Sequence, residues 1–126
     1  MNKIAIKEGF KILHFDEFPI LFIGKNDMQQ VIIGSFICEN DDDNTLKYFH
    51  SRVNNSLATK FLRRKISYID LLKAASVICI VTKDYYDNIL HIEEKNYSDI
   101  DTSYLPLPFS FCPEIEHEMN KEAVQY

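Results

Sequence analysis

The pattern of apolar residues changes near Ser56, and this change constrains the fold of the chain more than any other feature. Before it, three runs rich in β-branched and aromatic residues predict strands: PILFIGK (19–25), QVIIGSFIC (30–38) and TLKYFHSRV (45–53). After it, apolar residues recur at helical spacing, at Leu57, Ala58, Phe61 and Leu62. We therefore expect a meander of three antiparallel strands, followed by a short helix that Ser56 caps.

A second helix is expected after Ser67, because Ser67 and Asp70 have the spacing of a capping box. A single longer helix is the alternative. The apolar run SVICIV (76–81) predicts a strand inside the sheet, and ILHIEE (89–94) predicts its returning neighbour. The fold class expected is α+β, an antiparallel sheet in the order β-β-β-α-α-β-β with one or two short helices packed on one face.

The length of 126 residues favours one domain. We expect a single α+β domain over residues 1–113, followed by residues 114–126 as a polar C-terminal tail or an artificial end of the chain. Lys7, Glu8 and Lys11 interrupt the apolar residues of the N-terminal segment, which disfavours a secretory signal. The longest apolar stretch, AASVICIV, is too short for a membrane span, so we expect a cytoplasmic protein without membrane partners. Three widely spaced cysteines indicate neither a disulfide framework nor a zinc site.

Charge is distributed unevenly along the chain. The formal net charge of -5 disfavours general nucleic-acid binding. The segment KFLRRK (60–65) is nevertheless basic, whereas ENDDDN (39–44) and EIEHEMNKE (114–122) are acidic. Leu62 must face the core for its helix to pack, which leaves a basic rim as the candidate partner-binding site, formed by Lys60, Arg63, Arg64 and Lys65. The partner expected is another protein or a second copy of this chain, and an ordinary solvated surface is the alternative.

Two acidic segments invite other interpretations. Asp16 and Glu17 could act as catalytic carboxylates, but their position before Pro19 favours a turn that leads into a strand. Asp41 and Asp43 have the first spacings of a calcium-binding EF-hand loop. That loop needs Gly at its sixth position and Glu at its twelfth, where this chain has Leu46 and Arg52. Both segments are therefore interpreted as turns.

Enzymatic motifs are weak throughout the sequence. Asp84, Glu93 and Lys95 have the residue types of metal-dependent nucleases, in which two carboxylates hold magnesium and Lys stabilises phosphate charge. The four histidines have no metal-ligand spacing, and only three glycines are available for phosphate-binding loops. We therefore predict no catalytic residue, no cofactor and no metal site.

Several motifs together resemble a family of small bacterial domains of unknown function. They are FDEFPILF (15–22), a hairpin with an acidic loop, SRVNNSLATKFLRRKISYIDLLKAA (51–75), an apolar strand and SYLPLPFSF (103–111). Members have Asp-x-Pro-x-Leu-Phe, a short meander, a Leu-Leu-Gly-Lys-Ile helix turn and a Tyr-Leu-Pro end. This chain departs from the pattern twice. Phe18 separates the acid pair from Pro19, and Arg64 stands where the family has Gly, which puts the turn between the helices in question.

The resemblance implies a bacterial α+β module and carries no catalytic residue. The function expected is a non-enzymatic protein-interaction or regulatory domain of a bacterial cytoplasmic system, such as phage defence or toxin control. A metal-dependent nuclease is one alternative. A small-ligand sensor, with its pocket between the sheet and the helices, is the other.

Overall fold

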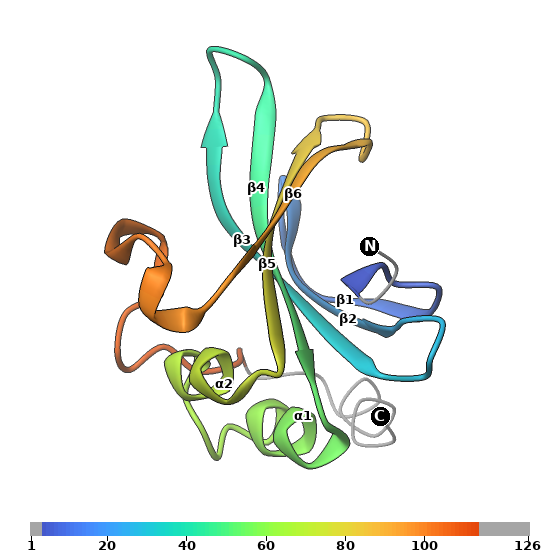
Figure 1. Ribbon diagram of the computed structural model, residues 1–126, viewed down its shortest axis with the longest axis vertical. Helices are drawn as coiled ribbons and strands as arrows, with labels where there is room; N and C mark the ends of the chain where they lie inside the picture. The colour runs from blue at the N-terminus through green and yellow to red at the C-terminus, as the bar shows by residue number, and fades with distance from the viewer. Residues whose placement is uncertain (1–3, 114–126) are drawn as a thin grey trace.

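The computed structural model describes residues 4–113, which form a six-stranded antiparallel sheet and two short helices. The strands lie side by side in chain order: β1 (Glu8–Asp16), β2 (Phe18–Lys25), β3 (Val31–Asn40), β4 (Thr45–Val53), β5 (Val77–Asp84) and β6 (Ile89–Lys95). Two helices, α1 (Asn55–Leu62) and α2 (Tyr68–Ala74), connect β4 to β5 and lie at one end of the sheet (Figure 1). Short 3-10 turns follow β6, η2 (Tyr97–Asp99) and η3 (Thr102–Tyr104).

The expected antiparallel α+β architecture is confirmed, but the strand order is wrong in one respect. Four strands precede the helices instead of three, because β1 was not predicted. β1 is an edge strand, and its side chains are exposed or half-buried along its whole length. Its sequence therefore lacks the apolar alternation by which a strand is recognised.

The acid pair lies at the turn between β1 and β2. Asp16 ends β1, Phe18 begins β2, and Glu17 alone makes the turn with a φ of 64°. A left-handed conformation at this residue reverses the chain in one step, and the two flanking residues then pair across the hairpin. The interpretation of this segment as a turn is therefore confirmed.

Side-chain caps fix the starts of both helices. Asn54, rather than Ser56, caps α1, and its side chain accepts a hydrogen bond of 2.8 Å from the backbone N–H of Leu57. Ser67 caps α2 as expected, and its capping box with Asp70 has both hydrogen bonds, of 3.1 and 3.5 Å. The two helices are thus separate elements.

The turn between the helices has the hydrogen-bond pattern of a Schellman motif. The N–H of Lys65 donates to the carbonyl of Lys60 at 2.8 Å, and the N–H of Arg64 donates to the carbonyl of Phe61 at 3.0 Å. Arg64 has a φ of 62°, in the left-handed region that this position requires and that Gly adopts most readily. The departure from Gly at Arg64 therefore leaves the turn type intact.

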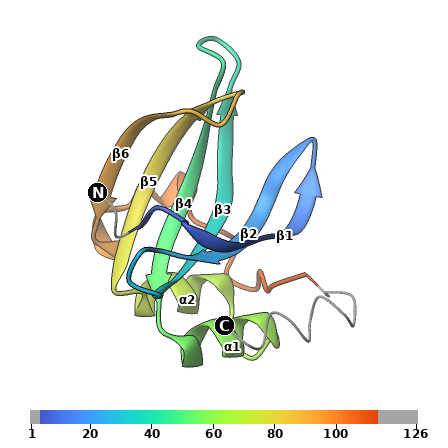
Figure 2. The ribbon, with the colours of Figure 1, turned by 90° about the vertical axis from the view of Figure 1, so that its right-hand side faces the viewer.

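The sheet is buried on both faces near its middle. On one face, Ile78 and Ile80 of β5 pack with Leu72 of α2, so these two side chains face the helices. On the other face, three β5 residues pack against Ile4 of the N-terminal segment: Val77, Cys79 and Val81. Figure 2 shows that the sheet curls, so that β1 and β2 run across the direction of β5 and β6. β5 is an interior strand, as predicted, and second from the edge.

The segment after η3 crosses the helices without joining the sheet. Its carbonyl at Ser110 accepts a hydrogen bond of 2.8 Å from the N–H of Tyr68, and Cys112 enters the core beside the helices. Its aromatic residues do not all pack along the domain, since Phe109 is 88% exposed. The predicted tail, residues 114–126, lies outside the described residues.

Neither helix could cross a bilayer, because α1 has eight residues and α2 has seven.

Candidate functional site

A pocket of about 300 Å³ lies where the β1–β2 turn approaches the β5–β6 turn. We call it the aromatic pocket, and its walls include Phe10, Phe18, Phe22, Tyr48 and Tyr85. Phe18 stacks between Phe36 and Tyr85, with ring centroids 5.9 and 6.1 Å apart. The curl of the sheet therefore brings together rings from its first and last hairpins.

Gly34 allows one wall of the aromatic pocket to form. The ring of Phe22 on β2 lies directly over this glycine on the neighbouring β3, and a β-carbon at residue 34 would overlap the ring. Phe22 also makes edge-on contacts with Tyr48 and His50, with centroids 5.5 Å apart in both cases. A glycine within a strand is typical of such a close approach.

Lys83 lies at the base of the aromatic pocket. Its ammonium nitrogen is 5.3 Å from the ring centroid of Phe22 and 5.1 Å from that of Tyr48, which are cation–π distances. The same nitrogen lies 3.0 Å from a carboxylate oxygen of Asp87, which is itself largely exposed. The ammonium is therefore held by two rings on one side and one carboxylate on the other.

Carboxylates surround the mouth of the aromatic pocket. Glu17, Asp84 and Asp87 line it, and the hydroxyl of Tyr85 donates a hydrogen bond of 2.6 Å to Glu39. That hydrogen bond raises the pKa of Tyr85 to about 12, and burial raises the pKa of Tyr48 to about 12 as well. Both phenols are thus uncharged near pH 7, so the negative charge at the mouth of the aromatic pocket comes from the carboxylates.

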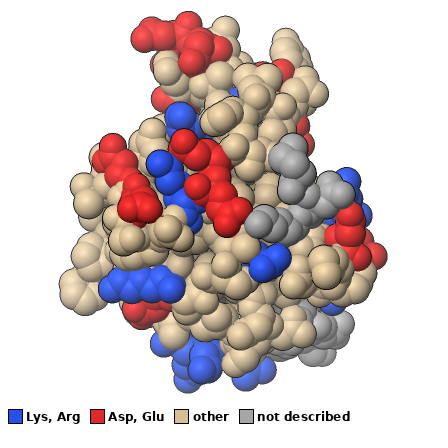
Figure 3. All heavy atoms as spheres, in the orientation of Figure 1, with Lys and Arg blue, Asp and Glu red and all other residues tan. Residues whose placement is uncertain are grey.

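The predicted basic rim is exposed as expected. Lys60 lies on α1, and Arg63, Arg64 and Lys65 form the turn that leads into α2. Figure 3 shows Lys and Arg side chains gathered at the end of the molecule that carries the helices, and Asp and Glu side chains at the opposite tip. We call these four residues the basic turn. The sheet separates it from the aromatic pocket.

The nuclease residues are not brought together. Asp84 ends β5 at the hairpin turn, whereas Glu93 pairs with Ile80 further along the ladder. The carboxylate of Asp84 accepts hydrogen bonds from the side-chain amide and the backbone N–H of Asn88 and from the backbone N–H of Tyr86, which lower its pKa and hold it in the turn. Glu93 instead pairs with Lys95, at 3.6 Å. The three side chains therefore do not form one site.

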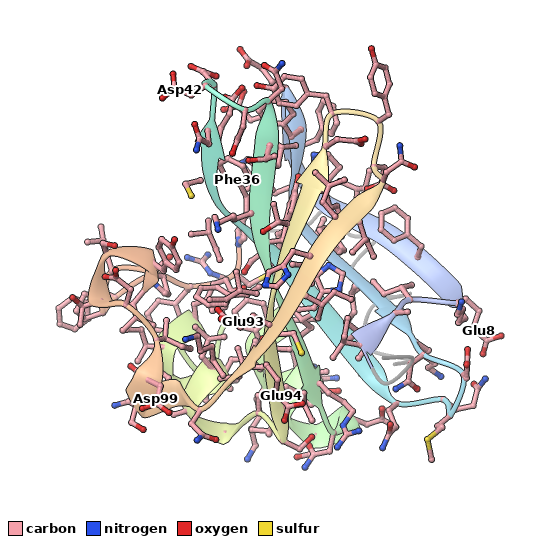
Figure 4. The ribbon with its side chains drawn as sticks, turned by 45° about the horizontal axis from the view of Figure 1, so that its top comes forward. Glu8, Phe36, Asp42, Glu93, Glu94 and Asp99 are labelled. Carbon is pink, nitrogen blue, oxygen red and sulfur yellow. The ribbon has the colours of Figure 1, made fainter. Side chains whose placement is uncertain are left out.

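The acidic loop forms the exposed turn between β3 and β4. The side-chain amide oxygen of Asn40 accepts from the N–H of Asp42, and the carboxylate of Asp43 accepts from the hydroxyl of Thr45, so both side chains help to shape the turn. Figure 4 shows Asp42 at the tip of this hairpin, far from Glu93 and Glu94 on β6 and from Asp99 beyond it. Within residues 4–113, no group of three or more His, Cys, Asp or Glu side chains could hold a metal ion.

A second pocket, of about 210 Å³, lies between the sheet and the helices. We call it the sheet–helix pocket. Ser35 of β3, Phe61 of α1 and Tyr68 of α2 line it, and the C-terminal segment closes it with Phe111 and Cys112. Burial raises the pKa of the Cys112 thiol to about 11, against a smaller opposing effect of Arg64. The thiol is therefore protonated near pH 7.

Sequence reasoning missed the residues of both pockets. Lys83 follows the apolar residues of β5 on the face that carries Val77, Cys79 and Val81. A lysine at that spacing is the one signal that the sequence offered, because alternate residues of a strand share a face. Ser35 and Tyr68 gave no such signal, since a hydroxyl in a strand or at the start of a helix is ordinary.

Comparison with known proteins found no matching family model, no similar curated protein and no similar solved structure. The resemblance to small bacterial domains stays a prediction.

Proposed function

We propose that the chain is a non-enzymatic protein-interaction domain that associates head to tail with further copies of itself. In each contact, the basic turn of one copy meets the acidic mouth of the aromatic pocket of the next. The observation that carries this proposal is the placement of a basic surface at the end with the helices and acidic side chains at the opposite tip (Figure 3), with exposed aromatic residues beside carboxylates at the aromatic pocket.

The chemistry of the two surfaces is complementary. Arg side chains stack on aromatic rings and pair with carboxylates, and both groups are present at the aromatic pocket. Phe10 and Tyr85 are 53% and 43% exposed there, as is typical of residues that become buried in a protein interface. Lys83 does not oppose this pairing strongly, because Asp87 already neutralises it.

The proposed contact joins two different surfaces, so it does not close into a twofold dimer. Every open assembly keeps one free surface of each kind at its two ends, so further copies can add until the ends meet in a ring. Charge pairing at exposed sites is weak and fades with salt. We therefore expect concentration-dependent assembly at low salt and dissociation in about 1 M salt, where the Debye length is about 3 Å.

Two variants test the proposal by sedimentation velocity. Arg63→Glu with Arg64→Glu reverses the charge of the basic surface. Glu17→Lys with Asp41→Lys reverses the charge of the acidic surface, where a carboxylate oxygen of Asp41 lies 3.5 Å from the hydroxyl of Tyr85. Each double variant alone should be monomeric, because its two surfaces carry the same charge. In a mixture, the intact acidic mouth of the first variant meets the intact basic turn of the second, and the two reversed surfaces also carry opposite charge. The mixture should therefore regain head-to-tail assembly, with the two variants alternating.

A matched control is Lys73→Glu with Lys95→Glu, which lowers the net charge by the same amount as the double Arg variant but on α2 and β6, away from both surfaces. These changes should leave assembly as it is in the wild type. A wild-type chain that stays monomeric at high concentration and low salt would contradict the proposal, and so would a mixture in which both variants stay monomeric.

The alternative of a small-ligand sensor is favoured by one specific observation, the unpartnered hydroxyls of the sheet–helix pocket. The nuclease alternative has no comparable support, since Asp84 lies apart from Glu93 and Lys95.

A further inference from the structure

Two residues that line the sheet–helix pocket each have a buried hydroxyl group without a hydrogen-bond partner among the described residues. These groups are the Oγ of Ser35 and the phenolic oxygen of Tyr68. Ser35 is only 4% exposed, and burial raises the pKa of Tyr68 far above its ordinary value. Each hydroxyl can both donate and accept a hydrogen bond, and a buried polar group without a partner is costly. Two such groups on one pocket indicate that a polar atom belongs between its walls.

Most of the remaining lining residues are apolar, and Ser110 is a polar exception. Leu21, Phe61, Phe111 and Cys112 contribute hydrocarbon, aromatic and thiol surface, and none of the lining residues within the described part of the chain is Asp, Glu, Lys or Arg. A charged ligand would lose its hydration there without gaining an opposite charge. His14 lines the pocket too, but it belongs to the edge strand β1 and its side chain is exposed. The chemistry therefore selects a neutral molecule.

The volume limits the size of that molecule. An engineered apolar cavity of about 150 Å³ in another protein holds benzene. A pocket of about 210 Å³ accommodates one ring with a small substituent. The hydroxyls of Ser35 and Tyr68 come from the sheet and from a helix, so a hydrogen-bonding group on the ring can reach one or both of them.

We propose that the sheet–helix pocket binds a small neutral ring compound that carries a hydroxyl, carbonyl or amide group. The apolar walls hold the ring, and the hydroxyls of Ser35 and Tyr68 bind its polar group. This site shares no lining residue with the aromatic pocket, so ligand binding here can be tested independently of head-to-tail association.

Phenol is the simplest probe, and titration calorimetry on the full chain measures its binding. Benzene has the ring without the hydrogen-bonding group, and benzoate has the ring with a charge. We expect saturable binding of phenol with one site per chain, weaker binding of benzene and no detectable binding of benzoate. Shifted amide resonances on phenol addition should include those of Leu21, Ser35, Phe61 and Tyr68.

Two conservative variants remove one hydroxyl each, Ser35→Ala and Tyr68→Phe. Each should weaken phenol binding about fivefold, which corresponds to the loss of one net hydrogen bond. Both should fold, because each deletes only an unpartnered atom, and thermal melting checks this. Ser51→Ala is the matched control: Ser51 is buried on the same sheet face and its Oγ also lacks a partner among residues 4–113, but it does not line the pocket.

Ser51→Ala should bind phenol as the wild type does. If the pocket serves only to hold ordered water, phenol should show no saturable binding. That result would overturn the proposal. Equal affinity for phenol and benzoate would overturn it as well, as would unchanged phenol affinity in both Ser35→Ala and Tyr68→Phe.

Discussion

Arg64 occupies a left-handed backbone conformation that Gly adopts more readily than Arg does. Its φ of 62° places the side chain of an L-residue in the left-handed region, where the β-carbon approaches the following carbonyl oxygen. The hydrogen bonds of the Schellman motif hold it there. The strain is therefore stored in the turn that also carries the basic surface.

Replacing Arg64 by Gly should stabilise the protein by up to about 1 kcal/mol, because relief of the strained φ outweighs the added freedom of the unfolded chain. Urea denaturation measures the change. The neighbouring Arg63 provides the control, since its φ of -87° is ordinary. Arg63→Gly should lower stability by roughly 0.5–1 kcal/mol. An equal loss in both variants would mean that Arg64 bears no conformational strain.

Among the secondary-structure elements, five of the six strands and both helices could be predicted from the sequence, but β1 could not. Four of the five recognised strands bury β-branched residues, and the fifth, β6, is an exposed edge strand that was recognised as the return of the apolar β5. EGFKILHFD is also an exposed edge strand, but no buried strand precedes it in the chain. Propensity alone cannot locate such a strand, because its pairing with β2 is decided by the Glu17 turn. The cap of α1 was misplaced for a related reason: Asn54, Asn55 and Ser56 are all good capping residues, and only backbone geometry distinguishes them.

The cap of α1 can be tested by two substitutions to Ala. Asn54→Ala should cost about 1 kcal/mol of stability, since the hydrogen bond to the N–H of Leu57 is lost. Ser56→Ala should be neutral or slightly stabilising, because Ser56 lies within the first turn and Ala has the higher helix propensity. Chemical denaturation of both variants checks the order. A larger loss of stability in Ser56→Ala than in Asn54→Ala would instead identify Ser56 as the cap.

β5 should respond strongly to truncation on its helix-facing side. Ile78 is 4% exposed and packs against α2, so Ile78→Ala should cost about 2–5 kcal/mol. Ile89 on the neighbouring β6 is 47% exposed, and Ile89→Ala should change stability by no more than about 0.5 kcal/mol. The denaturation midpoints of the two variants give the comparison. Equal effects would show that β5 is no more central than the sheet edge.

For the whole molecule, the basic turn could be predicted from sequence and the aromatic pocket could not. Lys60 to Lys65 are adjacent in the chain, so their charge is visible at once. Phe18, Tyr48 and Lys83 come from three distant segments, and only the curl of the sheet brings them together. The same holds for Ser35 and Tyr68, which line one pocket between the sheet and the helices.

Burial of His50 links the N-terminal segment to the stability of the whole fold. Its Nδ1 lies 3.0 Å from the carbonyl oxygen of Ile4, which can only accept, so Nδ1 carries the proton and donates. Its Nε2 is buried without a partner among the residues described. Burial lowers the pKa of His50 from 6.5 to about 4, because a second proton would have no acceptor.

Stability should therefore depend on pH through His50. The unfolded chain binds a proton below pH 6.5 that the folded chain resists, so the contribution is complete above that pH and is lost as pH falls toward 4. The loss should approach about 3 kcal/mol. Urea denaturation across this range should show a shallower pH slope for His50→Gln. The exposed His91 is the control, and a slope unchanged in His50→Gln would contradict the linkage.

The order of the sheet has a consequence for the speed of folding. Every strand pairs with its neighbour in the chain, so each hairpin can close before the next one forms. The exception is the pairing of β4 with β5, which must enclose the whole segment that carries α1 and α2. Closing that long loop costs more chain entropy than any of the hairpin turns, unless the helices form first and shorten it. Early formation of the two helices would thus determine how fast the two halves of the sheet join.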